Sequence, residues 1–166
     1  MMTAIVYTSN TGYTAAYARM LGEKLGLPVY SLKDAKKQLG KGREILYLGW
    51  LMASVVRGYR AASRRFRVVA LCAVGLCDTG TLMAEVRKTN SLSAELPLFT
   101  LQGGMDHAKL RGINKFMING LIKMLSSKKS LDEGETRMLM LIKTGGDLVR
   151  EENLSAFLEW YHRSVG

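Results

Sequence analysis

Side chains that can bind an anion gather in one short stretch near the N-terminus, Ser9–Thr14. An apolar, β-branched segment, Thr3–Tyr7, precedes this stretch, and a segment with helical spacing, Ala15–Leu25, follows it. We therefore expect a turn from a buried strand into a helix. Because the first amides of a helix have no partner within the helix and its dipole is positive there, such a turn can bind a phosphate.

The residue types within the stretch agree with a phosphate ligand. Hydroxyl groups on Ser9, Thr11 and Thr14 supply further donors, and Gly12 lacks a Cβ, so the backbone can close around an anion. The alternative is an ordinary helix N-cap, where Ser, Thr and Asn are also common. The strand before the stretch and the helix after it favour phosphate binding.

The pattern Ser9-x-Thr11-Gly12-x-Thr14, directly after the first strand, resembles the flavin mononucleotide (FMN) phosphate loop of flavodoxins. It lacks the Gly-Lys-Ser/Thr ending of the nucleoside-triphosphate loop and the three glycines of the dinucleotide fingerprint. The resemblance implies FMN as cofactor. The residues that it places around the phosphate are Ser9, Asn10, Thr11, Gly12, Tyr13 and Thr14.

Strand-like and helix-like segments alternate five times along the chain. Short hydrophobic strands in such a series pair in parallel, with right-handed crossovers and helices on both faces. The predicted fold class is therefore α/β, a doubly wound five-stranded parallel sheet in a single domain, residues 1–166. The flavodoxin resemblance implies the strand order 2-1-3-4-5, which places a ligand between the first and third strands. The predicted strands are Thr3–Tyr7, Leu27–Leu32, Glu44–Gly49, Val68–Val74 and Leu96–Leu101.

Helices are expected between and after these strands. Arg57–Phe66 looks like a basic amphipathic helix, and Asp78 is a candidate N-cap for the helix after it. Beyond the fifth strand, apolar residues recur at helical intervals, so extra C-terminal helices are predicted. The predicted helices are Ala15–Leu25, a short one within Lys33–Gly42, Arg57–Phe66, Thr79–Asn90, Leu110–Leu125, Leu131–Ile142 and Glu151–Arg163.

The C-terminal part carries a second resemblance. Three segments, GGMDxxKL at Gly103–Leu110, NKFMI at Asn114–Ile118 and IKM at Ile122–Met124, are similar to flavodoxin-like protoporphyrinogen dehydrogenases that pass electrons to menaquinone. They are also similar to a wider group of bacterial flavodoxin-domain proteins of unassigned activity. The similarity extends over nearly the whole chain, and its C-terminal part marks a subfamily rather than a reaction.

By the same resemblance, the flavin ring lies between two further loops at the carboxyl end of the sheet. Trp50 can stack on the ring, or it can be a core or rim residue without a role in binding. The three residues after Trp50 are expected to contact the flavin through their backbone. Amides after the fourth strand would approach the pyrimidine edge and tune the reduction potential. The residues expected around the ring are Trp50, Leu51, Met52, Ala53, Val74, Gly75 and Leu76.

Arginines follow the ring loop, and Arg57 is the closest of them to the predicted pocket. It is the preferred substrate-binding residue, because a guanidinium can hold porphyrin propionates, a quinone-bearing membrane surface or an acidic redox partner. The alternative is a solvated basic helix face. No catalytic residue is predicted, because no Ser/His/Asp set or carboxylate pair stands out and the flavin would carry the chemistry. Metal-ligand spacing is absent as well.

The net charge is +10, from 24 Lys and Arg against 14 Asp and Glu. Such a surface favours an anionic membrane or an acidic redox protein as partner, or is simply solvated. Nucleic acid is not expected, because no recognised binding motif occurs. Many flavodoxins are acidic, so the basic charge counts against a simple electron-shuttle role.

The N-terminus has no basic leader, and the longest uncharged apolar run, Ile45–Val56, is shorter than the roughly 20 residues that a membrane helix needs. Cys72 and Cys77 suit a reducing compartment, and on one strand they would face opposite sides. We expect a cytoplasmic protein, with peripheral contact to the inner face of the membrane left open. The preferred function is an FMN-dependent oxidoreductase. The alternatives are an electron carrier without its own substrate and a flavin-free binding module.

Overall fold

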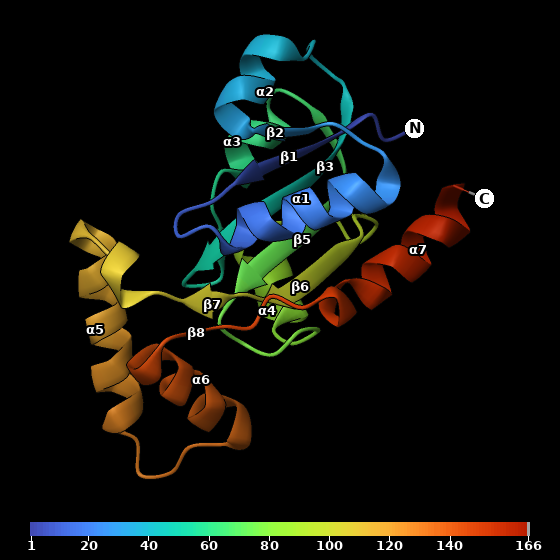
Figure 1. Cartoon of the computed structure of the whole chain (residues 1–166). Helices are drawn as coiled ribbons and strands as arrows, with labels where there is room; N and C mark the ends of the chain where they lie inside the picture. Colours follow the sequence, from blue (N-terminus) through green and yellow to red (C-terminus); the bar gives the residue numbers. More distant parts are fainter. Residues whose placement is uncertain (166) are drawn as a thin grey trace.

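A parallel sheet lies at the centre of the computed structural model, which describes residues 1–165 (Figure 1). The strand order is β2-β1-β3-β5-β6, and every neighbouring pair is parallel. Counted along these five strands the order is 2-1-3-4-5, so the predicted flavodoxin-like α/β fold is confirmed. The strands are β1 (Ala4–Thr8), β2 (Val29–Ser31), β3 (Glu44–Met52), β5 (Arg67–Gly75) and β6 (Leu98–Gln102).

Helices cover both faces of the sheet, which is why its central strands read as continuous apolar runs. On one face, Ile5 and Leu48 pack with residues of α1 (Tyr13–Leu25) and α7 (Ser155–Val165). On the other, Val6 packs with α2 (Leu32–Gln38), α3 (Tyr59–Ser63) and α4 (Met83–Thr89). Burying each large side chain of this kind contributes roughly 1.5–3 kcal/mol.

The extra helices form a hairpin that is inserted between β6 and α7. Its base is a two-stranded antiparallel ribbon of β7 (Gly104–Met105) and β8 (Gly146–Asp147). The inserted elements are η1 (His107–Lys109), α5 (Gly112–Ser126) and α6 (Glu133–Thr144), and η2 (Glu151–Leu154) then leads into α7.

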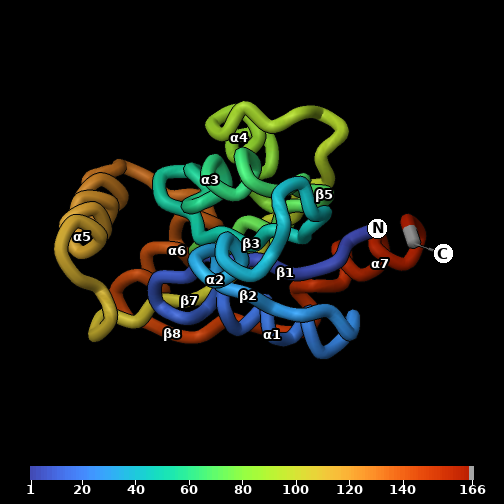
Figure 2. The backbone as a smooth tube through the Cα atoms, turned by 90° about the horizontal axis from the view of Figure 1, so that it is seen from above, coloured from blue at the N-terminus to red at the C-terminus, as the bar shows by residue number. Residues whose placement is uncertain are grey.

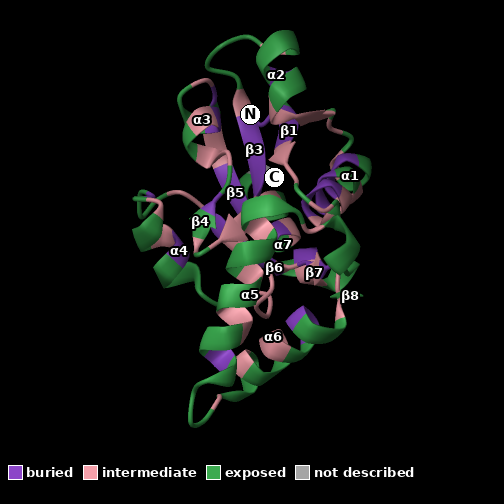
Figure 3. Cartoon of the chain, turned by 90° about the vertical axis from the view of Figure 1, so that its left-hand side faces the viewer, coloured by how far each residue is buried: buried purple, intermediate pink, exposed green. Residues whose placement is uncertain are grey.

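The hairpin extends away from the sheet and has a small core of its own (Figures 1 and 3). Leu125 of α5 packs with Leu141 and Ile142 of α6 and with Met105 of the ribbon. None of the described helices is long and apolar enough to cross a membrane.

Three boundary predictions were wrong. The basic helix expected at Arg57–Phe66 is only the five-residue α3, because β4 (Val55–Val56) turns back onto the end of β3. For the same reason, Trp50–Met52 belongs to β3 rather than to a loop. The helix expected from Thr79 begins at Met83, since Gly80 and Leu82 both adopt left-handed backbone conformations.

A hydroxyl network ties together the ends of β1 and β3. Thr8 Oγ1 lies 2.7 Å from the Tyr47 hydroxyl, which donates to the Arg57 carbonyl at 2.9 Å. Gly58, at φ +81°, completes the packing, because a Cβ there would lie 2.1 Å from the same hydroxyl. Tyr47 therefore fixes the residue that directly precedes the Ser9–Thr14 loop.

Burial raises the pKa of Tyr47 to about 12, above the roughly 10 of an unfolded chain. Between these two pKa values, the folded state retains a proton that the unfolded state loses. The contribution of Tyr47 to the free energy of unfolding is therefore present below about pH 10 and is lost by about pH 12. We expect Tyr47→Phe to cost about 1–2 kcal/mol at neutral pH through the lost hydrogen bonds. The variant should then lose less stability than the parent as the pH rises.

Urea unfolding between pH 7 and pH 11 measures both effects. Tyr30→Phe is the control, because Tyr30 is only half-buried and belongs to the short edge strand β2. Equal alkaline losses in the parent and in Tyr47→Phe would contradict the assignment.

Candidate functional site

The Ser9–Thr14 loop has the geometry of an anion site. Gly12 is the N-cap of α1 at φ +104°, no side chain caps the helix, and its first turn carries no acidic residue. The Ser9 hydroxyl accepts from the Gly12 amide at 3.1 Å, which folds the loop back on itself. Asn10 and Gly12 are exposed, so the loop is open to solvent. The first-turn amides are therefore available to a ligand.

The structure gives a further reason for glycine at position 12. A Cβ there would meet no protein atom within 4 Å, so packing against the rest of the chain does not require glycine. The positive φ at this position does favour glycine, because residues with a Cβ are strained in that conformation.

A cleft of about 610 Å³ opens beside the loop, at the carboxyl ends of β1, β3 and β5. Its size falls within the roughly 300–1,000 Å³ of small-molecule sites. Every residue predicted to hold the phosphate or the ring lines it except Gly12, which lines a second, more open hollow on the other side of the loop. Lys33, Lys36 and Lys37 also line that hollow and add positive charge near the loop.

Three polar side chains of the loop, those of Asn10, Thr11 and Thr14, belong to residues that line the cleft. Thr14 is only 2% exposed and lines the cleft. In the described part of the chain, no group bonds to the hydroxyls of Thr14 and Thr11 or to the Asn10 side chain. Hydroxyl and amide groups that bond to no protein group are free to bond to a polar ligand.

The predicted ring loop is a strained hairpin turn between β3 and β4. Ala53 and Ser54 have φ values of 48° and 61°, a conformation that two-residue turns usually give to Asn or Gly. Asn90, the C-cap residue of α4, stabilises the turn, because it donates to the Ser54 carbonyl at 2.8 Å and accepts from the Val56 amide at 2.9 Å. Backbone strain of this kind is common at ligand sites.

Arg57 lies outside the cleft lining. Its guanidinium stands over the Trp50 ring, 5.8 Å from the ring centroid, which is a cation–π contact. Of the other arginines, Arg65 donates to the Lys36 and Leu39 carbonyls, both at 3.2 Å, and Arg67 pairs with Glu44 at 2.9 Å. The predicted basic docking face is therefore partly engaged in structural contacts.

The far wall of the cleft comes from the helical hairpin and was missed by the sequence analysis. Met117, Leu121 and Met124 of α5 and Met138 of α6 line it, so this end of the cleft is apolar. Periodicity assigned these residues to a helix but not to a cavity, because a residue facing a cavity and a residue facing a core have the same spacing. The one available signal was an apolar stripe on α5 wider than a single packing face needs.

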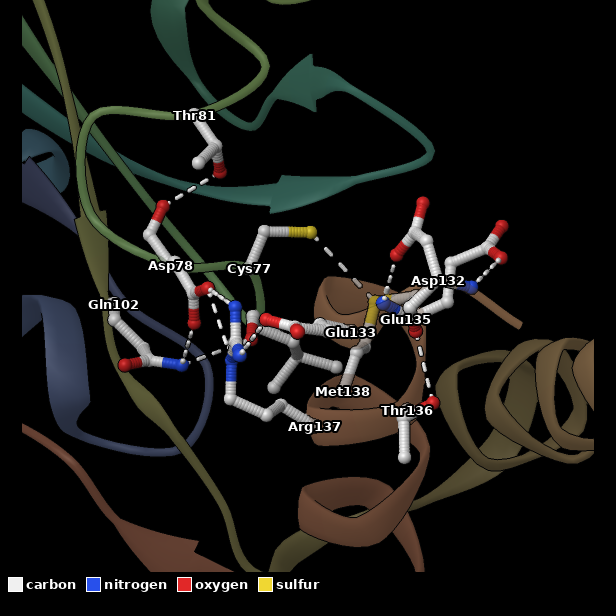
Figure 4. Close-up of polar contacts among 11 residues, drawn as sticks. Cys77, Asp78, Thr81, Gln102, Asp132, Glu133, Glu135, Thr136, Arg137 and Met138 are labelled. Carbon is white, nitrogen blue, oxygen red and sulfur yellow. Dashed lines mark hydrogen bonds and ion pairs between the residues drawn. The ribbon is translucent and has the colours of Figure 1, made fainter.

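Asp78 does not cap a helix, so that prediction was wrong: Leu82 occupies the N-cap position of α4. The Asp78 carboxylate instead accepts from Arg137 Nη2 at 2.6 Å and from Nε at 3.1 Å (Figure 4). Its charge raises the pKa of Arg137. This pair joins the loop after β5 to α6 and closes one side of the cleft.

Cys77 lies beside the same pair, with its Sγ 3.6 Å from the Met138 Sδ (Figure 4). Burial raises the pKa of its thiol, and the carboxylates of Asp78, Glu85 and Asp132 raise it further. The thiol therefore stays protonated at neutral pH and is a weak nucleophile. Within residues 1–165, no cluster of His, Cys, Asp and Glu side chains is arranged to hold a metal ion.

No protein-family model, curated protein or solved structure matched the chain. The flavodoxin-like description therefore rests on the strand order and on the position of the cleft.

Loss of the Asp78 charge should loosen the hairpin and leave the sheet intact. In Asp78→Asn, we expect amides of α6 to exchange about fivefold faster, because a partly exposed ion pair contributes up to about 1 kcal/mol. Hydrogen–deuterium exchange measures this. Glu133→Gln is the control, since the Glu133 side chain is 95% exposed and lies 3.6 Å from Arg137. Equal acceleration in β1 and α6 would indicate global destabilisation and contradict the local role.

Proposed function

We propose that this protein binds FMN in the cleft and acts as a flavin-dependent redox protein, preferably an oxidoreductase for a small substrate or a quinone. The observation that carries the proposal is the uncapped, open loop at the N-terminus of α1, located where the strand order reverses. Ligands of open α/β sheets bind at that point. FMN would supply the redox chemistry, and the chain would bind and orient it.

The phosphate end of FMN fits the loop. Its charge would be met by the first-turn amides of α1 and by the hydroxyls of Thr11 and Thr14, which have no partner among the described residues. No acidic residue lies in that turn to repel a phosphate. Lys33, Lys36 and Lys37 supply a positive field nearby.

The ring end of FMN fits the apolar part of the cleft. Trp50, Leu51 and Met52 form one side, and the Val74–Leu76 segment forms another. Arg57 stands over the Trp50 ring. The two side chains would therefore contact a bound flavin or substrate together, at the rim of the cleft. An apolar surround excludes water from a flat ring and favours its neutral form.

The size of the cleft favours an oxidoreductase over a simple electron carrier. The cavity continues from the ring loops to α5 and α6, which leaves room for a second flat, apolar reactant beside the ring. An electron carrier needs only an exposed ring edge and a partner protein.

FMN binding can be measured by flavin absorbance and fluorescence during titration. We expect Gly12→Asp to weaken binding at least about tenfold, because it adds a like charge beside the phosphate and a side chain at positive φ. Thr14→Val should weaken binding about fivefold, since it removes one donor without changing the volume.

Gly26→Asp is the matched control for this titration. Gly26 lies at the other end of α1, at φ +64°, and a Cβ there also meets no atom within 4 Å. The same charge and the same kind of strain are thus placed away from the loop. Equal affinities for Gly12→Asp and the parent would sink the loop assignment, as would a protein that stays colourless with FMN.

Reoxidation of the photoreduced flavoprotein distinguishes the two redox functions. We expect a small naphthoquinone to reoxidise it saturably, and Met117→Trp to slow this step by filling the apolar half of the cleft with FMN affinity unchanged. Ile113→Trp is the control, because Ile113 lies on the same helix outside the cleft lining. Reoxidation by a protein acceptor alone, insensitive to Met117→Trp, would identify an electron carrier instead.

A further inference from the structure

One face of α5 exposes large apolar side chains that nothing in the described chain covers. Ile113 is 67% exposed, Phe116 75%, Met117 37% and Met124 53%. At 3.6 residues per turn, these positions form one continuous stripe along the helix. We call this set the α5 stripe. The helix that carries it lies at one side of the molecule, away from the strands of the sheet (Figure 2).

The segment of the chain that carries the α5 stripe is basic. Between His107 and Leu131 the sequence contains Lys and Arg but no Asp or Glu. Lys115 and Lys123 lie on α5 itself, and neither pairs with a carboxylate in residues 1–165. Lys123 follows Phe116 by seven residues, so it lies on the same side of the helix, two turns further along. The basic residues of this segment are Lys109, Arg111, Lys115, Lys123, Lys128 and Lys129.

From this pattern we infer that α5 docks onto an anionic lipid surface, with the α5 stripe entering the headgroup boundary and the lysines contacting acidic headgroups. A helix with an apolar face flanked by Lys and Arg binds in the interface plane of such membranes. Nucleic acid offers no apolar layer for Phe116 and Ile113. A second copy of α5 would bring like charges together, because the segment has no acidic residue.

Docking of this kind brings the cleft close to the lipid surface. Met117 and Met124 belong to the α5 stripe and also line the cleft. If the α5 stripe contacts lipid, the apolar end of the cavity therefore lies next to the lipid surface. This inference does not depend on FMN, since the stripe and its charges belong to the chain alone.

Flotation of the full-length protein with vesicles tests the inference. We expect binding to phosphatidylcholine vesicles that contain about 30% phosphatidylglycerol, weak binding to phosphatidylcholine alone, and a decrease at high salt. The double variant Ile113→Gln/Phe116→Gln should lower the partition coefficient at least about tenfold, because two exposed apolar anchors are lost. Lys115→Glu/Lys123→Glu should lower it by a similar factor.

The charge-matched control is Arg60→Glu/Arg64→Glu, whose exposed side chains belong to the α3 region on the sheet domain. It makes the same change in net charge away from the α5 stripe and should leave binding unchanged. Equal loss in both charge variants would point to general electrostatics and overturn the assignment to α5. Absence of vesicle binding would overturn it too, as would self-association that Phe116→Gln abolishes, since a second copy would then cover the stripe.

Discussion

The reversal of strand order between β1 and β3 is the constraint on which the rest of the structure depends. A parallel sheet must be covered on both faces, so the chain after β1 leaves toward one face and the chain after β3 toward the other. The two connections diverge, and the space between them remains open at the carboxyl end of the sheet. The Thr8–Tyr47–Arg57 network keeps the two strand ends together below that opening. Both the Ser9–Thr14 loop and the β3–β4 turn acquire their positions from this one arrangement.

The cleft joins two chemically different halves. Its sheet side offers helix amides, hydroxyls and a positive field, which suit an anion. Its hairpin side offers Met and Leu side chains, which suit a flat apolar group. The hairpin has a separate small core and is joined to the β5 loop by the Asp78–Arg137 pair. The hairpin side of the cleft therefore depends on its own small core, whereas the side formed by the Ser9–Thr14 loop is built on the central strands.

The basic charge of the chain is divided between different tasks. Arg65 and Arg67 of the region after the ring turn bond to the C-terminal end of α2 and to Glu44, and so contribute to the fold. Lys33, Lys36 and Lys37 border the hollow beside the loop. The lysines of α5 have neither role and flank exposed apolar side chains instead. The net charge therefore combines three groups of basic residues, which lie in different local environments and have different effects.

The sequence by itself determined the sheet, its parallel strands and the turn from strand to helix at Ser9–Thr14, because these depend on local features: apolar runs, the alternation of elements and a glycine between hydroxyls. The end of the first helix at Leu25 was also predicted from the sequence, and the structure confirms it. Only the tertiary structure decided that Val55–Val56 folds back on β3, that Asp78 bonds to Arg137, and that α5 and α6 form a cleft wall. These depend on residues distant in sequence, and helical periodicity reports that a face is apolar without reporting what lies opposite it.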